Sequence, residues 1–272
     1  MNDPPRSQPR GVVRYANNIA ESAFASVVEE SWLEITCNGL HVTTLASSPF
    51  DNHSLVVGHL YFRRLIKEPE DIRAIETRWL AGRERVRVEV ELVEESASRL
   101  RQVSGMAPWV QLETDVLFPP DSPSLPATVR LAPLDIMALM RDLYSQAEHY
   151  RMSRGIHAAG LSDGQSLLVV AEDLSRHCAM DKVIGHALLR GEPTMGRVLF
   201  TTGRLSSGLI CRAYHAGIEI LLSRTSPTQL ALSLAERLGI TVVGYVRANG
   251  LSVYTRTDRV VASDQSPVVD RG

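Results

Sequence analysis

Cysteine is scarce in this chain of 272 residues. The three cysteines, Cys37, Cys178 and Cys211, lie far apart, and no two of them have the spacing of a zinc or redox motif. An odd number of widely separated thiols is typical of a protein in a reducing compartment. The sequence therefore predicts neither a disulfide framework nor a structural metal site.

Long apolar runs are also missing. No stretch approaches the roughly 20 apolar residues that a membrane-spanning helix needs. The first residues, Met1 to Arg10, are polar and rich in proline, without the apolar core of a signal peptide. We therefore expect a cytoplasmic protein that has no membrane partner.

The sequence also lacks an excess of positive charge. The net charge is −2, and Lys67 and Lys182 are the only lysines, so arginine supplies almost all of the basic side chains. Such a balance creates no global field that would attract nucleic acid or an anionic membrane. We expect no nucleic-acid partner, and any anion-binding site must be a local group of side chains.

The composition that is present belongs to a folded protein. Hydrophobic residues make up 44% of the chain and charged residues 22%, which is enough to build a core for one large domain or two small ones. The sequence patterns predict an N-terminal tail over residues 1–24, an α+β domain over residues 25–133, a larger α/β domain over residues 134–257 and a C-terminal tail over residues 258–272. The predicted fold class is α/β, with the smaller α+β domain first.

Alternating apolar residues define the first domain. Residues 31–37 alternate and are followed by Asn38-Gly39, which predicts a strand, a tight turn and a second strand. A helix is predicted after Pro49, and residues 83–93 predict another strand. The segment from Ser96 to Pro133 contains repeated prolines, so we expect an irregular connecting loop that ends the domain.

The second half repeats a strand and helix order. A helix over residues 134–150 opens it, and four apolar runs then alternate with helical patterns. This order predicts an α/β sandwich. The predicted strands are residues 167–171, 197–202, 218–222 and 240–245, and the helices between them are residues 180–189, 206–216 and 228–238.

Ionisable side chains crowd the segment from Glu172 to Lys182, directly after the apolar run from Leu167 to Ala171. Packing alone does not explain this density, because a buried charge is tolerated only when it is paired or hydrogen-bonded. Such a cluster at the carboxyl end of a strand is typical of a binding or catalytic site.

Each of the four predicted strands is followed by a polar loop, and the carboxyl ends of parallel strands meet at one edge of a sheet. Hydroxyl groups, free N–H groups at helix starts and arginines suit a phosphate or pyrophosphate. We therefore predict a site for a nucleotide-like polyanion. The alternative is that the hydroxyls only cap helices and the arginines are solvated. The candidate residues are Arg176, His177, Asp181, Lys182, Gly203, Arg204, Ser206, Ser207, Ser226 and Thr228, with Val246 to Gly250 after the last strand.

Several motifs follow one another in a recognisable order. In the first half they are Asn38-Gly39, Ser48-Pro49-Phe50-Asp51 and Gly58-His59-Leu60; in the second half they are Gly155 to Ala159, Glu172 to Lys182 with Gly185, Gly203 to Ser207, Ser226 to Thr228 with Leu230-Ala231, and Val253 to Thr255. In order and spacing these motifs resemble the formate dehydrogenase accessory protein family, FdhD. The resemblance runs from about Glu30 to Thr255.

This resemblance implies a cytidine-deaminase-like fold for the second half and a homodimer. It also implies binding of bis-molybdopterin guanine dinucleotide (bis-MGD), with GDP as a ligand that mimics its guanine end. The implied partners are the catalytic subunit of a molybdenum formate dehydrogenase, a cysteine desulfurase and cofactor-synthesis proteins. The stretch Tyr245-Val246-Arg247-Ala248-Asn249-Gly250 occupies the position that the family uses to hold the cofactor.

One departure from the family pattern is large. Sulfur carriers of the family have a Cys-x-x-Cys pair in the loop between the two halves, whereas this chain has Ser104-Gly105-Met106-Ala107-Pro108-Trp109 there. A thioether or an indole cannot form the thiolate that carries a persulfide. The expected function is therefore binding and delivery of the cofactor, as a non-enzymatic chaperone.

Three alternatives stay open. Cys178 follows Arg176 and His177 close to a predicted helix start, which favours a thiolate and a sulfurtransferase, although a cysteine there is more often a small buried residue. The others are a pocket that binds only a guanine nucleotide and a purely protein-binding assembly factor.

Several polar side chains have two interpretations. The neighbours Glu172 and Asp173 would accept from a guanine edge or pair with arginines, and Asp181 would orient Arg176 or Lys182. His157 and His177 would donate to phosphate or to the dithiolene sulfurs, or each would hold a loop in place through backbone hydrogen bonds.

Overall fold

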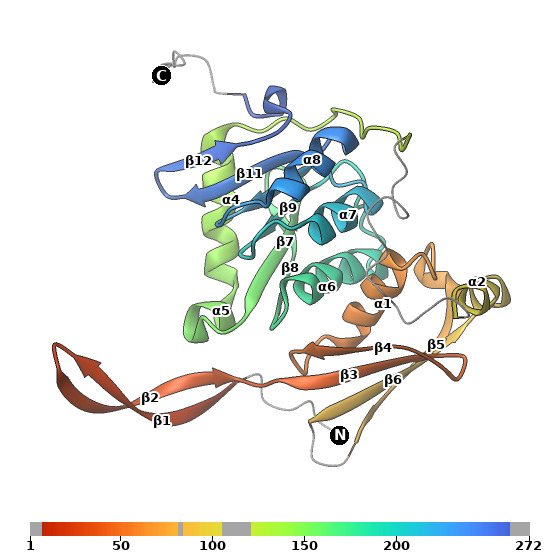
Figure 1. Ribbon diagram of the computed structural model, residues 1–272, viewed down its shortest axis with the longest axis horizontal. Helices are drawn as coiled ribbons and strands as arrows, with labels where there is room; N and C mark the ends of the chain where they lie inside the picture. The colour runs from red at the N-terminus through yellow and green to blue at the C-terminus, as the bar shows by residue number, and fades with distance from the viewer. Residues whose placement is uncertain (1–6, 81–83, 105–120, 262–272) are drawn as a thin grey trace.

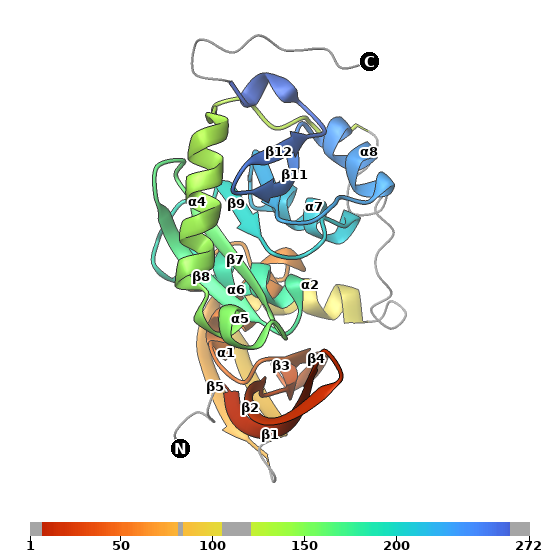
Figure 2. The ribbon, with the colours of Figure 1, turned by 90° about the vertical axis from the view of Figure 1, so that its left-hand side faces the viewer.

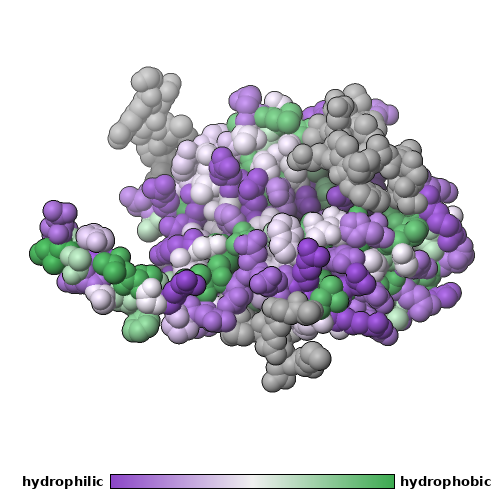
Figure 3. Space-filling view, turned by 60° about the horizontal axis from the view of Figure 1, so that its bottom comes forward, coloured by the Kyte–Doolittle hydropathy of each residue, from purple (hydrophilic) through white to green (hydrophobic). Residues whose placement is uncertain are grey.

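The computed structural model describes residues 7–80, 84–104 and 121–261 and arranges them around three sheets (Figure 1). The smallest is a two-stranded ribbon of β1 (Ser7–Ala16) and β2 (Ile19–Val28), which projects from the body. Its apolar side chains lie on the surface of the molecule (Figure 3). Phe24 is 77% exposed and Tyr15 74%. The prediction of a tail over residues 1–24 is wrong from Ser7 onward. Because neither face of this ribbon is buried, its sequence does not show the regular spacing of core residues by which a strand is predicted.

A four-stranded sheet forms the lower part of the body. Its order is β4-β3-β6-β5, and β3 and β6 are parallel. The predicted turn at Asn38-Gly39 is confirmed, because both residues have positive φ angles between β3 and β4. Helix α1 packs against the inner face of this sheet, as the shared core cluster shows. The elements are β3 (Ser31–Cys37), β4 (Leu40–Ser47), α1 (Asn52–Phe62), a 3-10 turn (Pro69–Asp71), β5 (Ile72–Trp79) and β6 (Arg85–Leu92).

The connection between the halves is only partly irregular. Helix α2 (Glu94–Ser104) occupies the start of the segment that we predicted to be a loop, so that prediction is wrong there. Residues 121–132 contain no helix or strand apart from a single bridge between Leu131 and Val260. The segment that stands where the family has its Cys-x-x-Cys pair falls, after Ser104, outside the described residues.

A six-stranded sheet forms the upper part, in the order β12-β11-β10-β9-β7-β8. Strands β9, β10 and β11 are parallel, whereas β7 is antiparallel to both of its neighbours. The four predicted strands are present, and β7 and β12 are additional. Their bounds are β7 (His157–Ser162), β8 (Leu167–Asp173), β9 (Val198–Thr201), β10 (Ile220–Ser223), β11 (Thr241–Arg247) and β12 (Gly250–Val253).

Helices cover both faces of this sheet, so the α/β fold class is confirmed (Figure 2). Helices α6 (Arg176–Leu189), α7 (Ser207–His215) and α8 (Gln229–Leu238) pack on one face, and α4 (Pro133–Gln146) packs on the other. The predicted helix over residues 134–150 is interrupted at Ala147, after which α5 (Glu148–Ser153) begins. Alternate strand residues face the two helical layers, as the period of a strand requires.

The end of the described chain is held against the body. A 3-10 turn (Thr257–Arg259) places the Arg259 side chain, which is fully buried, among backbone carbonyls. Its guanidinium donates to the carbonyls of Gly239 and Pro126, each at 2.6 Å, and lies 3.8 Å from the Glu219 carboxylate. The predicted C-terminal tail over residues 258–272 is therefore wrong for its first residues.

The two parts of the body meet where helix α1 crosses helix α6 (Figure 1). Gly58 and Gly185 lie at this crossing, and neither position has room for a side chain. Because α1 belongs to the core of the four-stranded sheet and α6 to that of the six-stranded sheet, this contact sets how the halves pack together.

Candidate functional site

The four polar loops lie at the same edge of the six-stranded sheet. Strand β8 runs in the direction of β9, because β7 is antiparallel to both, and β10 and β11 are parallel to β9. The carboxyl ends of β8, β9, β10 and β11 therefore share one edge, the carboxyl edge of the sheet. Helices α6, α7 and α8 begin directly behind the first three of these strands.

The helix starts at this edge differ in how they are capped. The Ser175 hydroxyl accepts from the backbone N–H of His177 at 3.3 Å, and the Thr228 hydroxyl accepts from Ala231 at 3.3 Å. Thr228 thus has the capping role that was the alternative interpretation. Ser206 stands at the N-cap of α7 but makes no capping bond, and its hydroxyl lies 3.4 Å from Nε2 of His177.

Two arginines at this edge lie close together without a carboxylate. Burial and the neighbouring Arg204 lower the pKa of Arg176, and Nε of Arg176 is buried with no hydrogen-bond partner among the described residues. In that part of the chain no carboxylate lies within ion-pair distance of either guanidinium. Two adjacent cations without a counterion are the arrangement that phosphate and pyrophosphate groups commonly bind in proteins, so a phosphate site here stays a prediction.

Gly203 shapes this arginine pair. A Cβ atom at Gly203 would lie 2.7 Å from Cβ of Arg176, so the arginine side chain packs directly on the glycine backbone. The loop is held below by the Ser223 hydroxyl, which donates to the Gly203 carbonyl at 2.6 Å, and by the Thr201 hydroxyl, which accepts from the Gly203 N–H at 3.1 Å. Gly203, one of the predicted site residues, is therefore required for the close approach of the Arg176 side chain to the loop backbone.

Arginine and tyrosine side chains line the other end of the carboxyl edge. A cavity of about 320 Å³ lies between helix α4 and the loops after β10 and β11. The Arg224 guanidinium lies 5.2 Å from the ring centre of Tyr144, and that of Arg247 lies 5.9 Å from the ring centre of Tyr245. Of the predicted residues, Val246, Arg247 and Ala248 line this cavity, Tyr245 is 43% exposed beside it, and Asn249 and Gly250 form the exposed turn that follows.

Two histidines lie between the ends of the edge. Burial, together with Arg212 and Arg176, lowers the pKa of His177 to about 4, and burial and Arg176 also lower the pKa of His157. Nδ1 of His157 lies 3.4 Å from the Thr202 hydroxyl. Both rings are therefore neutral near pH 7, so each offers one donor and one acceptor.

The prediction that Asp181 orients Arg176 or Lys182 is wrong. The Asp181 carboxylate instead accepts from Nε of Arg212 at 2.6 Å and from His59, whose Nδ1 lies 3.2 Å away. Burial would raise the pKa of Asp181, but Arg212 and His59 outweigh it and hold the pKa far below its usual range. The sequence analysis named His59 only within a family motif and did not propose His59 or Arg212 as a partner of Asp181; the available signal was a histidine among the apolar residues of α1.

Lys182 is buried and cannot reach a ligand at the surface, so its place in the predicted anion site is wrong. Its ammonium lies 2.7 Å from the Asp173 carboxylate, and both side chains are fully buried. The neighbouring Glu172 accepts from the backbone N–H groups of Tyr150 at 2.6 Å and His149 at 3.3 Å. Among the residues that the structure describes, neither Glu172 nor Asp173 pairs with an arginine; Asp173 pairs with Lys182, and Glu172 accepts from backbone N–H groups.

Cys178 lies in the first turn of α6, as the sequence indicated, but it is only 5% exposed. Burial, with Asp173 and Asp181 nearby, raises the pKa of its thiol far above the usual range. Burial also raises the pKa of Cys37 to about 12 and that of Cys211 to about 11. None of the three thiols has the environment of a nucleophile at neutral pH.

We therefore expect the native thiols to be unreactive. At pH 8 a disulfide reagent such as Ellman's reagent should modify the folded chain about 100-fold more slowly than the unfolded chain, in which all three cysteines react. The thiolate release, followed by absorbance with and without denaturant, measures the ratio. A fast-reacting native thiol that disappears in Cys178→Ala would contradict this expectation.

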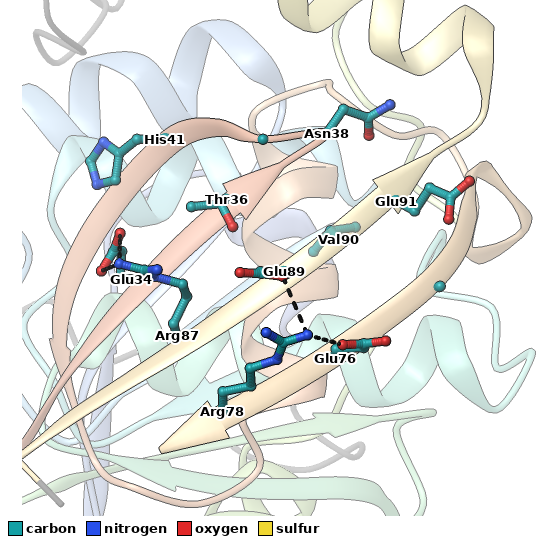
Figure 4. A pocket seen from close by; sticks show the side chains of 12 residues that line it. Glu34, Thr36, Asn38, His41, Glu76, Arg78, Arg87, Glu89, Val90 and Glu91 are labelled. Atoms are coloured by element: carbon teal, nitrogen blue, oxygen red, sulfur yellow. Dashed lines mark hydrogen bonds and ion pairs between the residues drawn. The ribbon is translucent and has the colours of Figure 1, made fainter. Parts of the chain in front are cut away.

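A larger hollow of about 620 Å³ lies on the outer face of the four-stranded sheet (Figure 4). Both arginines that line it are paired with carboxylates: Arg78 lies 2.9 Å from Glu76, and Arg87 lies 3.2 Å from Glu34. None of the predicted site residues lines it. Such a ladder of surface ion pairs is typical of a solvated sheet face.

Two kinds of feature are absent from the residues that the structure describes. No group of three or more histidine, cysteine, aspartate or glutamate side chains there is arranged to hold a metal ion. No helix in the same part of the chain combines the length and apolar character needed to span a membrane.

Comparison with known proteins gives a consistent result. The sequence model of the FdhD/NarQ family matches residues 28–261. A protein named sulfur carrier protein FdhD from Staphylococcus haemolyticus (strain JCSC1435) is 29% identical, over 94% of this chain and 98% of its own length. The protein of the same name from Staphylococcus aureus (strain JH9) is also 29% identical, over 93% of this chain and 96% of its own. A crystal structure from Desulfotalea psychrophila, assigned as a formate dehydrogenase accessory protein, superposes with a TM-score of 0.75 and 26% identity, covering 94% of this chain and all of that one.

Proposed function

The chain belongs to the FdhD/NarQ family, and from this membership we propose that it is a formate dehydrogenase accessory protein that binds bis-MGD and delivers it to the catalytic subunit of the enzyme. The observation that carries the proposal is the pair Arg176 and Arg204, two cations at the carboxyl edge with no carboxylate partner among the described residues. Each half of bis-MGD contains a pyrophosphate, whose oxygens need such donors.

The residues of the carboxyl edge fit a long polyanion. Arg176 and Arg204 would hold one pyrophosphate, and the uncapped start of α7 would add backbone N–H groups. Arg224 and Arg247, with Tyr144 and Tyr245, would hold a charged and aromatic part of the ligand at the other end. The bound cofactor would supply the molybdenum chemistry, while the protein would supply only orientation and protection.

Sulfur transfer is the second candidate, because the relatives are named sulfur carriers. That activity requires an accessible thiolate on the carrier. This chain has three cysteines, none of them in a Cys-x-x-Cys pair, and all three are buried with raised pKa values. We therefore propose binding and delivery, without a persulfide on this chain, and a homodimer as the acting unit. A cysteine desulfurase or a cofactor-synthesis protein would then act before this protein.

The test begins with protein purified from cells that make the molybdenum cofactor. Wild type should retain bis-MGD, detected as oxidised-pterin fluorescence, released guanine nucleotide and molybdenum. Arg204→Ala should lose most of it and bind GDP about 10- to 100-fold more weakly, because a hydrogen bond to a charged group is worth about 1.5–3 kcal/mol. Titration calorimetry with GDP measures the second effect.

The matched control is Arg190→Ala. Arg190 stands at the C-cap of α6, at the opposite end of the helix that begins with Arg176, and it is exposed. This variant should bind GDP like wild type. Wild-type protein that carries no cofactor and does not bind GDP would overturn the proposal and favour an assembly factor that contacts only proteins.

A further inference from the structure

The ribbon of β1 and β2 carries an exposed apolar surface away from the body of the molecule (Figures 1 and 3). Each strand has 10 residues, so the ribbon is about 33 Å long. At its base β2 contacts α5, and a Cβ at Gly155 would lie 3.3 Å from the Val28 side chain. A two-stranded ribbon by itself is only marginally stable in water. A ribbon that projects in this way therefore needs another surface to pack against.

The two faces of the ribbon differ in charge. Side chains alternate between the faces of a strand, and the register of the two strands places Val13, Tyr15 and Phe24 on the same face. All three are exposed, Val13 by 59%. No side chain of β1 or β2 that is charged at neutral pH lies on this side, which we call the uncharged face. The opposite face holds the charged residues of both strands, Arg10, Arg14 and Glu21.

The uncharged face is large enough for a protein interface. Two paired strands are about 10 Å wide, so a stack of two such faces along their full length would bury on the order of 1,000 Å² in total. That area reaches the lower limit of a specific contact between proteins. Phe24 lies halfway along β2, and an aromatic side chain at the centre of an interface commonly supplies much of the binding energy.

Two arguments favour a second copy of this chain as the partner. Each residue near a two-fold axis meets its own copy, so a charged face would bring like charges together, whereas the uncharged face avoids this repulsion. The ribbon also needs its cover for as long as the fold persists. A second copy is present throughout, but an enzyme that receives the cofactor is bound only during delivery.

We propose that the uncharged faces of two copies pack against each other across a two-fold axis, and that this contact holds the homodimer. The two ribbons lie antiparallel in this dimer, so the two Phe24 rings meet near the axis and each Tyr15 lies close to the base of the other ribbon. The charged faces point to solvent. The inference rests on the proposed function for the homodimer itself, and it adds the surface through which the dimer forms.

Sedimentation equilibrium of the full chain measures this contact. Phe24→Ser should raise the dissociation constant of the dimer at least about 30-fold, the usual effect of truncating an aromatic hot spot. The matched control is Ile19→Ser. Ile19 is 64% exposed near the turn of the same ribbon, but on the opposite face, so this variant should leave the dissociation constant unchanged.

A disulfide between two copies checks the geometry, including the case in which Phe24→Ser disturbs the ribbon itself. The three native cysteines are buried, so a cysteine introduced on the ribbon supplies the reactive thiol. Oxidation by diamide should link two Phe24→Cys chains, because the two thiols meet near the axis. Ile19→Cys, on the opposite face, should link at least 10-fold more slowly, as followed by electrophoresis without reductant.

The outcomes separate this inference from the proposed function. A dimer whose dissociation constant Phe24→Ser leaves unchanged, or a Phe24→Cys chain that links no faster than Ile19→Cys, would overturn the inference even if a homodimer forms and binds GDP. A chain that stays monomeric and uses Phe24 to bind the dehydrogenase subunit would overturn it in favour of that enzyme as the partner. Neither result would alter the effect of Arg204→Ala on GDP binding, which tests the cofactor site.

Discussion

Replacing Gly185 with alanine should destabilise the protein by about 3 kcal/mol, at the upper end of the usual range for overpacking a core. Gly185 lies where α6 crosses α1, and its added Cβ would stand 1.8 Å from the backbone carbonyl oxygen of Ser54 and 2.9 Å from the backbone nitrogen of Gly58. Both obstacles are backbone atoms. No side-chain rotation relieves such a clash, so the two helices must move apart.

Neither helix is free to move. Helix α1 contributes to the core under the four-stranded sheet, and α6 contributes to the core under the six-stranded sheet. Gly58→Ala should act in the same way, because its Cβ would lie 1.8 Å from the carbonyl oxygen of Asp181. Separation of α1 from α6 would also widen the cavity of about 460 Å³ that residues of both helices line.

Urea unfolding of Gly185→Ala and wild type measures this effect. The matched control is Gly11→Ala, on the exposed ribbon, where an added Cβ would meet nothing within 4 Å and the φ angle is not positive. That control should be neutral or slightly stabilising, because alanine restricts the unfolded chain. Equal stability of Gly185→Ala and wild type would show that the halves do not pack through this crossing.

Replacing Lys182 with methionine should cost about 3–5 kcal/mol, the usual penalty for leaving a buried charge without its partner. The lysine ammonium and the Asp173 carboxylate lie 2.7 Å apart with both side chains fully buried. The ammonium also donates to the backbone carbonyls of Glu172 at 3.3 Å and Ser48 at 3.4 Å. Methionine matches the length of the lysine side chain but removes the charge and every donor.

The other lysine of the chain is the natural control. Lys67 pairs with Glu95 at 3.0 Å, but both side chains are about 70% exposed, at 72% and 69%. Solvent screens such a pair, so Lys67→Met should leave the unfolding midpoint almost unchanged. Thermal unfolding of both variants compares the two lysines directly, and similar midpoints would contradict the assignment of Lys182 as a structural cation.

A second substitution can test the cause of the Lys182→Met effect. Asp173 also accepts from the backbone N–H groups of Ser175 at 2.9 Å and Ser48 at 3.2 Å. Asparagine would keep an acceptor for these groups without the charge. Lys182→Met combined with Asp173→Asn should therefore recover part of the lost stability, whereas no recovery would place the cost in lost packing.

Part of the fold could be predicted from the sequence because its pattern is local. The Asn38-Gly39 pair has the residues that a tight turn requires, and β8, β9, β10 and β11 are apolar runs of the length that a buried strand has. The strands β5 and β7 were missed. Strand β5 is polar and half-exposed at a sheet edge, and β7 is built largely from small residues, so neither shows a clear period.

For the candidate site, too, one part could be predicted from the sequence and another part depends on the tertiary structure. The sequence alone determined that polar loops follow the strands of an α/β sheet, and hence that Arg176, Arg204 and Arg247 gather at one edge. Tertiary structure alone decided that Lys182 is buried, that Cys178 is shielded, and that His59 meets Asp181, 122 residues further along the chain. The succession of strands and helices along the chain follows from local periodicity, whereas burial and long-range pairing depend on how α1 packs on α6, which no local pattern encodes.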